Sequence, residues 1–360
     1  MTTKNLKKGS DPCKGRTLTM KIMEVCGSHT AVIVKSGLAS LLPPNIELIS
    51  GPGCPVCVTA QGDIDNILEI AQKDDVLVVA FGDMLKVPGT RISLKKIRAE
   101  RGNVEIVYSP LDVINIAESN SEKTVLYFAV GFETTVGATA ALIKEAKRKK
   151  IRNLKIYSTH KLIMPAMKAL LDGESEIDGF ILPGHVSTVT GYGYFEDIAK
   201  IYKKPAVVAG FWPENVLESV EEIQTLVKRG KAEVKSVYKV VLKSVNMEWQ
   251  KLVKEFFVVE NAAWRGFGKI PKSGLDINDK YKEFDAKLFF NIKDVKRTDK
   301  PGCSCGEVIK GMKKPAECSL FGKACVPDNP FGPCMVSEEG SCSVWYKYSY
   351  NSKIKGQKSK

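Results

Sequence analysis

Short apolar runs alternate with helical patterns from residue 20 to about residue 255. Most runs are rich in β-branched residues and precede a segment in which apolar residues recur at helical spacing, as at 63–72 and 136–149. The predicted strands are residues 20–25, 46–50, 76–82, 104–109, 125–130, 154–159, 179–184 and 206–211. Strands that alternate with helices predict an α/β fold with parallel sheets and helices on both faces.

The sequence divides into three parts. We expect two parallel-sheet α/β domains of similar build, at residues 1–120 and 121–258. Residues 76–90 align without a gap to residues 125–139, which fits either an internal duplication or convergent strand–turn–helix chemistry. Near residue 259 Gly, Pro and Lys become frequent and the alternation stops, so residues 259–360 are expected to form a separate cysteine-rich domain.

Net charge and hydropathy restrict the partners. The net charge is +13, but the lysines are spread out, and the densest run, at 144–155, ends a predicted helix, where cations are favourable. The sequence lacks segments in which basic and aromatic residues alternate, as they do in proteins that bind single-stranded nucleic acid. An acidic protein partner therefore fits the charge better than nucleic acid. No apolar run reaches the ~18 residues of a membrane span. The polar N-terminus lacks an apolar h-region, which predicts a cytoplasmic protein.

Ten cysteines fall in two groups, near the two ends of the chain. In a cytosolic protein structural disulfides are rare, so clustered thiols indicate metal ligation, thiol–disulfide exchange, or both. The first group is Cys13, Cys26, Cys54 and Cys57, and the second is Cys303, Cys305, Cys318, Cys325, Cys334 and Cys342.

Chemically distinctive residues follow the predicted strands. Ligands of open α/β sheets bind beyond the carboxyl ends of the strands, so we expect these residues to line one cleft if the sheets face each other. A single histidine there is usually a hydrogen-bonding residue with no chemical role, but all three histidines of the chain occupy such ends. The residues in question are Cys26, His29, Cys54, Cys57, Asp83, Glu133, His160, His185, Trp212 and Glu214.

Cys26 lies just before a predicted helix. The helix dipole and the free N–H groups there favour a thiolate, and His29 is placed to act as its base or to stabilise it as an imidazolium. The plainer alternative is a buried, inert cysteine. A Cys–His protease is disfavoured because no Asn or Asp partner pattern is evident and because such an enzyme leaves the nearby CxxC unexplained.

Cys54 and Cys57 form a CxxC inside a turn set by Pro52, Gly53 and Pro55. Two thiols at this spacing close a disulfide or bind a metal. A zinc site requires a second CxxC at a suitable distance, which the sequence lacks. A redox-active pair is therefore favoured over zinc.

The C-terminal cysteines are irregularly spaced on Gly/Pro-rich segments. The paired CxxC knuckles of a zinc ribbon and the CxxxCxxC of radical-SAM proteins are both absent. A 4Fe–4S cluster accepts scattered cysteines, since it presents separate iron corners. The spacing therefore favours a 4Fe–4S cluster over zinc.

Together these motifs resemble the HypD family of hydrogenase maturation proteins, almost end to end and in collinear order. The matching segments are residues 23–30 (MEVCGSHT), 51–57 (GPGCPVC), 131–135 (GFETT), 159–167 (THKLIMPAM), 182–191 (LPGHVSTVTG), 262–275 (AAWRGFGKIPKSGL) and 315–342. The resemblance implies a redox-active scaffold for assembly of the Fe(CN)₂CO unit of NiFe hydrogenase, rather than a free-turnover enzyme. It also implies a HypC-type partner that shares the iron, and a HypE-type cyanide donor charged with the help of HypF.

The resemblance also assigns roles by motif. It implies that Cys26 is the iron-site thiolate, that Cys54 and Cys57 are an exchangeable dithiol, and that Glu133 belongs to the site. His29 and His185 would hydrogen-bond cyanide nitrogens or hold protons. The implied cluster ligands are Cys318, Cys325, Cys334 and Cys342. Cys303 and Cys305 are left over, either of them a possible replacement for one ligand, and Cys13 receives no role.

Two rival functions stay open. One is a cluster-dependent thiol–disulfide reductase, which would turn over a substrate disulfide without an iron-loaded partner. The other is a nucleic-acid module using the +13 charge, which would show a steep salt dependence of affinity.

Overall fold

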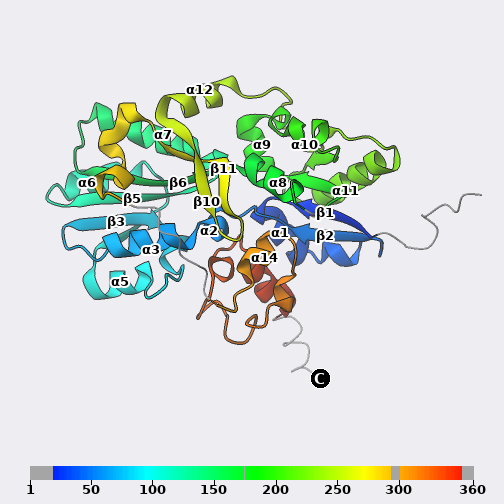
Figure 1. Ribbon diagram of the computed structural model, residues 1–360, viewed down its shortest axis with the longest axis horizontal. Coiled ribbons are helices and arrows are strands. Elements are labelled where there is room, and N and C mark those ends of the chain that lie inside the picture. The colour runs from blue at the N-terminus through cyan, green and yellow to red at the C-terminus, as the bar shows by residue number, and fades with distance from the viewer. Residues whose placement is uncertain (1–18, 174, 293–300, 351–360) are drawn as a thin grey trace, which may run out of the picture.

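The computed structural model describes residues 19–173, 175–292 and 301–350. In this part of the chain two β-sheets lie side by side, each flanked by helices, and a small C-terminal unit packs beneath their junction (Figure 1). Cys13 lies outside the described residues.

The first sheet is parallel throughout, in the order β2-β1-β7-β8-β9. Helix α1 (Gly27–Lys35) follows β1, and α11 (Pro213–Lys228) packs on β7 and β8. Its strands are β1 (Met20–Glu24), β2 (Ile46–Ser50), β7 (Gly179–Leu182), β8 (Ala206–Val208) and β9 (Val234–Ser236).

The second sheet has the order β10-β11-β6-β5-β3-β4. Its strands are β3 (Val76–Phe81), β4 (Val104–Val107), β5 (Thr124–Gly131), β6 (Leu154–Lys161), β10 (Phe257–Trp264) and β11 (Gly268–Ile277). Strands β3 to β6 are parallel, whereas β10 and β11 form an antiparallel hairpin added at the β6 edge. The central strand β5 is buried from Val125 to Gly131, as expected for a parallel strand covered on both faces.

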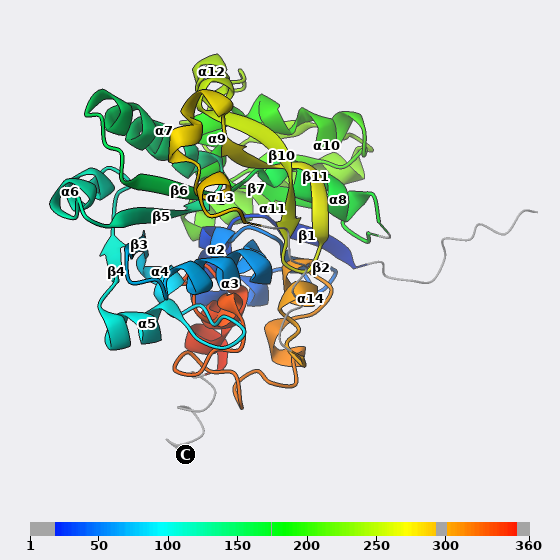
Figure 2. The ribbon, with the colours of Figure 1, turned by 60° about the vertical axis from the view of Figure 1, so that its left-hand side comes forward.

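Helices cover both faces of the second sheet (Figures 1 and 2). Residues such as Leu142 and Ile143 of α7 are fully buried in the core with Tyr127 of β5. The main covering helices are α3 (Gln61–Ile70), α5 (Leu94–Arg101), α6 (Asp112–Ser119), α7 (Glu133–Arg148), α12 (Met247–Phe256) and α13 (Ala286–Phe289).

The α/β class and all eight predicted strands are confirmed, and each strand begins within one residue of its predicted start. Sequence patterns missed β9, which has only three residues, and the β10–β11 hairpin. The hairpin was missed because its Gly-, Pro- and Lys-rich sequence resembles a loop.

Sheet membership does not follow the expected division at residues 120 and 258. Residues 1–120 supply β1 and β2 to the first sheet and β3 and β4 to the second, and residues 121–258 likewise supply strands to both. The chain crosses from one sheet to the other after β2 and returns after β6. The sequence does not reveal this, because a crossover between two sheets has the same strand–helix pattern as a crossover within one sheet.

The C-terminal unit consists of short helical turns joined by loops, below both sheets in Figures 1 and 2. Its elements are α14 (Cys305–Ile309), η4 (Pro315–Glu317), η5 (Pro333–Met335) and α15 (Ser341–Trp345). It packs through α15 on α1, and through α14 and η5 on the short helix α2 (Pro55–Val58). A unit so poor in regular structure has a small apolar core, here Phe321, Cys325 and Met335.

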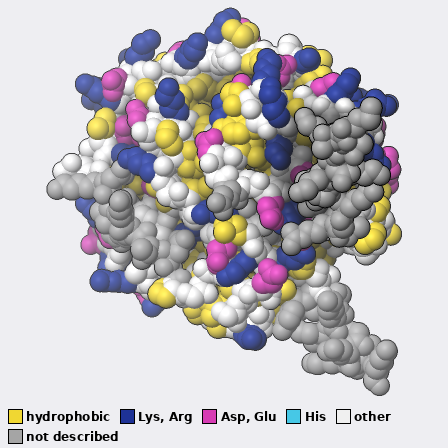
Figure 3. All heavy atoms as spheres, turned by 45° about the vertical axis from the view of Figure 1, so that its right-hand side comes forward, with side chains coloured by type: hydrophobic (Ala, Val, Ile, Leu, Met, Phe, Trp, Pro, Cys, Tyr) yellow, Lys and Arg dark blue, Asp and Glu magenta, His cyan; other side chains and the backbone are white. Residues whose placement is uncertain are grey.

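Two surface properties bear on the predicted partners. Basic and acidic side chains are interspersed on the face in Figure 3, without a continuous basic stripe. Within the described residues, none of the helices combines the length and apolarity needed to cross a bilayer.

Candidate functional site

A cavity of about 490 Å³ lies where the strands of the two sheets end. Its wall includes residues that follow β1, β3, β4, β5 and β7, as the sequence predicted for an α/β cleft. It also includes two residues of the C-terminal unit. The polar and aromatic residues of the wall are Cys26, Phe81, Asp83, Tyr108, Phe132, Thr134, Thr135, His185, Ser337 and Glu339.

Cys26 occupies the cap position between β1 and α1 and is 7% exposed. Its backbone N–H donates to Glu24 Oε2 at 2.9 Å, and the Thr30 hydroxyl donates to the same buried carboxyl group. Burial raises the pKa of Glu24 to about 8, so this carboxyl group is largely protonated at neutral pH. Glu24 thus fixes the turn that presents Cys26.

The Cys26 sulfur is a thiol in the free protein, contrary to the expectation from the helix start. Burial, together with the carboxyl groups of Glu339 and Glu24, raises the pKa of Cys26 to about 12. The favourable helix N-terminus is outweighed, because a buried thiolate beside two carboxyl groups lacks a compensating cation.

His29 is fully buried behind the cavity wall, and His185 lies in the wall itself. The His29 Nε2–H donates to the Gly210 carbonyl at 3.0 Å, and burial lowers the pKa of His29 to about 4. This lowered pKa favours the neutral ring, and so disfavours the imidazolium, one of the two roles that the sequence left open for His29. Both rings stack on Phe211, with centroid distances of 5.2 Å for His29 and 3.9 Å for His185.

His160 lies apart from the other two histidines, so the expectation that all three line one cleft is wrong. Its Nε2 lies 2.8 Å from the Thr139 hydroxyl of α7, and its ring meets the edge of Phe257. Burial lowers the pKa of His160 to about 4. His160 has the structural role of a satisfied core histidine.

Glu133 is fully buried, and its neighbours Phe132 and Thr134 line the cavity in its place. Its Oε1 accepts hydrogen bonds from the Ile163 N–H at 2.8 Å and from the Tyr194 hydroxyl at 3.0 Å. Burial raises the pKa of Glu133 to about 7. The side chain joins α7 to α8 (Ile163–Leu171) and η2 (Tyr192–Phe195).

Cys54 and Cys57 are joined by a disulfide in α2, and both are buried. Cys54 caps this short helix, because its sulfur accepts the Cys57 N–H at 3.1 Å. Pro55 and Val56, between the two cysteines, line the same cavity as Cys26. The turn that carries the disulfide therefore contributes to the same wall as Cys26, through residues next to the two cysteines.

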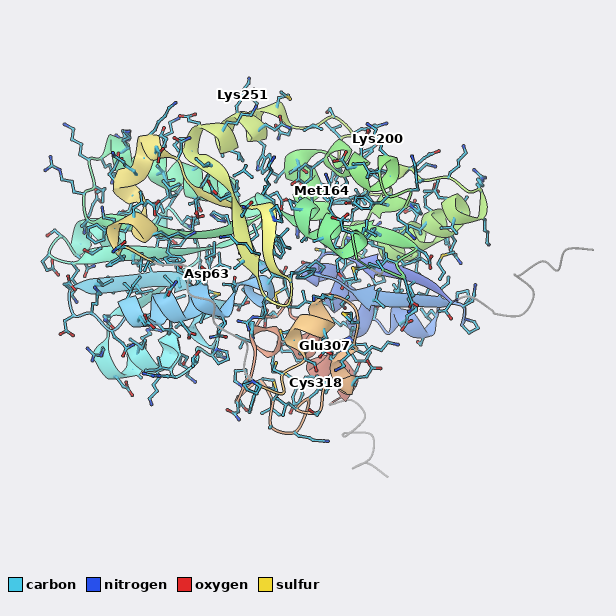
Figure 4. All side chains as sticks on the ribbon, viewed as in Figure 1. Asp63, Met164, Lys200, Lys251, Glu307 and Cys318 are labelled. Carbon is cyan, nitrogen blue, oxygen red and sulfur yellow. A yellow bond between two sulfur atoms is a disulfide. The ribbon has the colours of Figure 1, made fainter. Side chains whose placement is uncertain are left out.

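The six C-terminal cysteines converge on one small cavity of their own, and Figure 4 shows Cys318 in this unit. The predicted ligands are all present there, and Cys303 and Cys305, which had no assigned role, join them. Hydrogen bonding to Cys305, together with burial, raises the pKa of Cys303, and Cys305 is hydrogen-bonded in turn to Cys334.

Six converging sulfurs form the donor set that an iron–sulfur cluster uses. Throughout residues 19–350, apart from the undescribed gaps, no group of three or more His, Cys, Asp or Glu side chains is arranged to hold a metal ion. The donor type fits a cluster, but the geometry does not single out four ligands.

Sequence patterns missed the contribution of residues 337–339 to the cavity. The Ser28 hydroxyl donates to Glu339 Oε1 at 3.0 Å, and the Ser337 hydroxyl donates to Asp83 Oδ2 at 2.9 Å. Burial raises the pKa of Glu339. No spacing rule connects this loop with Ser28 and Asp83, which lie 311 and 254 positions before their partners in the chain.

Known proteins match nearly the whole chain. A family model described as HypD, "Hydrogenase formation hypA family", matches residues 2–349. The hydrogenase maturation factors HypD of Azotobacter vinelandii and Escherichia coli (strain K12) are each 40% identical over 337 and 332 residues, covering 91% of this chain and 89% of the relative. A putative hydrogenase expression/formation protein of Methanocaldococcus jannaschii is 40% identical over 330 residues, 91% of this chain and 92% of the relative.

Proposed function

The chain belongs to the HypD family of hydrogenase maturation proteins, and from this premise we propose that it is the scaffold on which the Fe(CN)₂CO unit of NiFe hydrogenase is assembled. The observation that carries the proposal is the position of Cys26. This residue lines a cavity of about 490 Å³ between two sheets. Pro55 and Val56, which lie between the disulfide-bonded Cys54 and Cys57, line the same cavity.

Cys26 is proposed to bind the iron of the assembling unit, which is the cargo of the scaffold. A thiolate sulfur suits a soft metal centre. Because the free thiol is protonated, metal binding must displace its proton. The Glu339 carboxyl group, which shares the cavity with Cys26, is placed to receive that proton.

His185 and the neutral His29 are proposed to support the cargo from the first sheet. His185 lines the cavity, and its ring is held by stacking on Phe211. A neutral ring in that wall offers one N–H donor to a cyanide nitrogen. His29, which also stacks on Phe211, would hold the Phe211 ring in place.

The thiols are proposed to supply the redox capability. Opening the Cys54–Cys57 disulfide to a dithiol takes up two electrons and two protons. The six-cysteine cavity is proposed to hold a 4Fe–4S cluster, with Cys318, Cys325, Cys334 and Cys342 as the ligand set expected from the sequence. When bound, the cluster would supply single electrons.

Partners are proposed on the same basis. A HypC-type protein would share the iron and a HypE-type protein, with HypF upstream, would deliver cyanide. Both need access to the cavity, and Tyr108 in its wall is 92% exposed.

The test is to purify the full-length protein anaerobically together with its HypC-type partner and to record infrared spectra. The proposal predicts bands of iron-bound cyanide and carbon monoxide in the complex. A complex that contains iron but lacks both kinds of band would contradict it.

The second candidate function is an iron–sulfur-dependent thiol–disulfide reductase. It is favoured by the packing of α2, which carries the disulfide, against α14 of the six-cysteine unit. Multiple-turnover reduction of a protein disulfide by the isolated chain and an electron donor would favour the reductase. Infrared bands without such turnover would favour the scaffold.

A further inference from the structure

The tip of the β10–β11 hairpin connects the disulfide helix with the six-cysteine unit. Both Figures 1 and 2 show this tip reaching the level of α14. Trp264 forms an isolated antiparallel bridge with Thr59, immediately after α2. The next residue, Arg265, is only 4% exposed.

Arg265 holds the C-terminal end of α2 at several points. Its backbone N–H donates to the Val58 carbonyl at 2.9 Å, and its Nε donates to the Thr59 carbonyl at 3.2 Å. Its Nη2 donates to Gln61 Oε1 at 3.1 Å. The guanidinium thus satisfies carbonyl and amide oxygens that follow the CxxC turn.

The other side of the hairpin tip meets the six-cysteine unit. Gly266 lies against Gly306 of α14, so that a Cβ on Gly266 would stand 2.6 Å from the Gly306 Cα. Gly266 also has φ +80°, a conformation that glycine adopts without strain. Hydrogen bonding to Cys305 and burial raise the pKa of Cys303, and the Arg265 charge acts in the opposite direction there and at Cys305.

We infer that Arg265 is a positioning residue for thiol exchange at Cys54–Cys57, because it holds α2 in the disulfide-closing conformation when the two sulfurs are reduced. This inference rests on the proposed redox role of that pair. A four-residue helix does not persist by itself, so the reduced turn depends on its attachments. The covalent bond already fixes the same turn in the oxidised protein.

The direction of the effect follows from this difference. Loss of the guanidinium contacts increases the conformational freedom of the reduced turn more than that of the oxidised turn. Formation of the Cys54–Cys57 disulfide then costs more chain entropy. The disulfide then forms less readily, and its reduction potential rises. A residue with a purely structural role would destabilise both forms equally and leave the potential unchanged.

The experiment equilibrates the full-length protein with dithiothreitol redox buffers, alkylates the free thiols, and quantifies Cys54 and Cys57 by mass spectrometry. The dithiol reagent donates the two electrons and two protons that open the disulfide. For Arg265→Gln, the equilibrium constant for disulfide formation is expected to fall about tenfold, which corresponds to about 30 mV. Arg265→Lys, which keeps the charge and one donor site, is expected to fall between wild type and Arg265→Gln.

Lys310→Gln is the matched control, because Lys310 contacts the same hairpin tip, with its Nζ 5.4 Å from the Phe267 ring centroid. An unchanged potential in Lys310→Gln and a raised potential in both Arg265 variants would support the inference. Should Arg265→Gln fail to fold, the comparison of Arg265→Lys with wild type decides. An unchanged or lowered potential in the Arg265 variants overturns the inference. If the wild-type pair itself does not exchange with dithiothreitol, the redox part of the proposed function fails.

Discussion

Gly53 lies directly against Cys26: a Cβ added to Gly53 would stand 2.3 Å from the Cys26 backbone nitrogen and 2.5 Å from its Cα. The Gly27 N–H also donates to the Gly53 carbonyl at 3.1 Å. The turn that carries the disulfide is therefore in backbone contact with the proposed iron ligand.

The first prediction concerns this contact. Gly53→Ala must push two backbone segments apart, so we expect a loss of about 1–3 kcal/mol in the free energy of unfolding, measured by denaturant titration. Gly137→Ala is the control, since a Cβ there meets nothing within 4 Å and alanine favours the helix by up to about 1 kcal/mol. Equal stability of Gly53→Ala and wild type would show that the contact is not tight.

The second prediction concerns the buried Glu24 carboxyl group. Its pKa in the folded protein, about 8, lies above the reference value of 4.5, so the folded state binds its proton more tightly than the unfolded state. Its stabilising contribution is therefore complete below pH 4.5 and is lost as the pH rises towards 8. Between pH 4.5 and 8, ionisation of Glu24 should lower the free energy of unfolding of the wild type by up to about 1.4 kcal/mol per pH unit. Glu24→Gln should lack this part of the decline. Parallel pH profiles for the two proteins would argue against a raised pKa.

Much of the fold and part of the site could be predicted from sequence, for identifiable reasons. Continuous β-branched runs such as 125–130 locate buried parallel strands, and residues after such runs fall at the ends of the strands. Such patterns do not tell which way a side chain points once the strand has ended. Hence Glu133 and His160 were predicted in the cleft but face the interior behind it.

The positions of the cysteines in the sequence also predicted one part of the site and left another part undetermined. Clustering in the sequence indicated a shared pocket for Cys318 and its neighbours, and the structure brings all six C-terminal thiols to one cavity. Their spacing does not select four ligands, because irregular loops bring distant residues together. The cavity contact of Glu339 was missed for the same reason.

The third prediction addresses the six-cysteine cavity. Cys325→Ala should abolish the visible absorption of an iron–sulfur cluster and lower the iron content of the anaerobically purified protein. Cys26→Ala, which changes the other cavity, should retain the cluster absorption and serves as the control. A Cys325→Ala protein with unchanged spectra and full cluster content would remove Cys325 from the ligand set.

The fourth prediction is that Cys54 and Cys57 cycle between disulfide and dithiol. After treatment with reductant, alkylation and mass spectrometry should find two more labelled thiols, both in the peptide that contains residues 54–57. The physical basis is the CxxC turn, which keeps the two cysteines within closing distance, with their Cα atoms 5.3 Å apart. Identical labelling before and after reduction, over a range of potentials, would indicate a static role.

The central claim is that Cys26 holds the iron while its ligands are assembled, and infrared spectroscopy of the Cys26→Ala complex with the HypC-type partner tests it most directly. We expect the fold and the cluster absorption to persist and the cyanide and carbonyl bands to disappear. Cys26→Ser should fail too, because a hydroxyl is a poor ligand for a soft metal centre, whereas Cys13→Ala should keep the bands. Normal cyanide and carbonyl bands in Cys26→Ala would contradict the account and move the iron to another ligand, with Cys54 or Cys57 as the leading candidate.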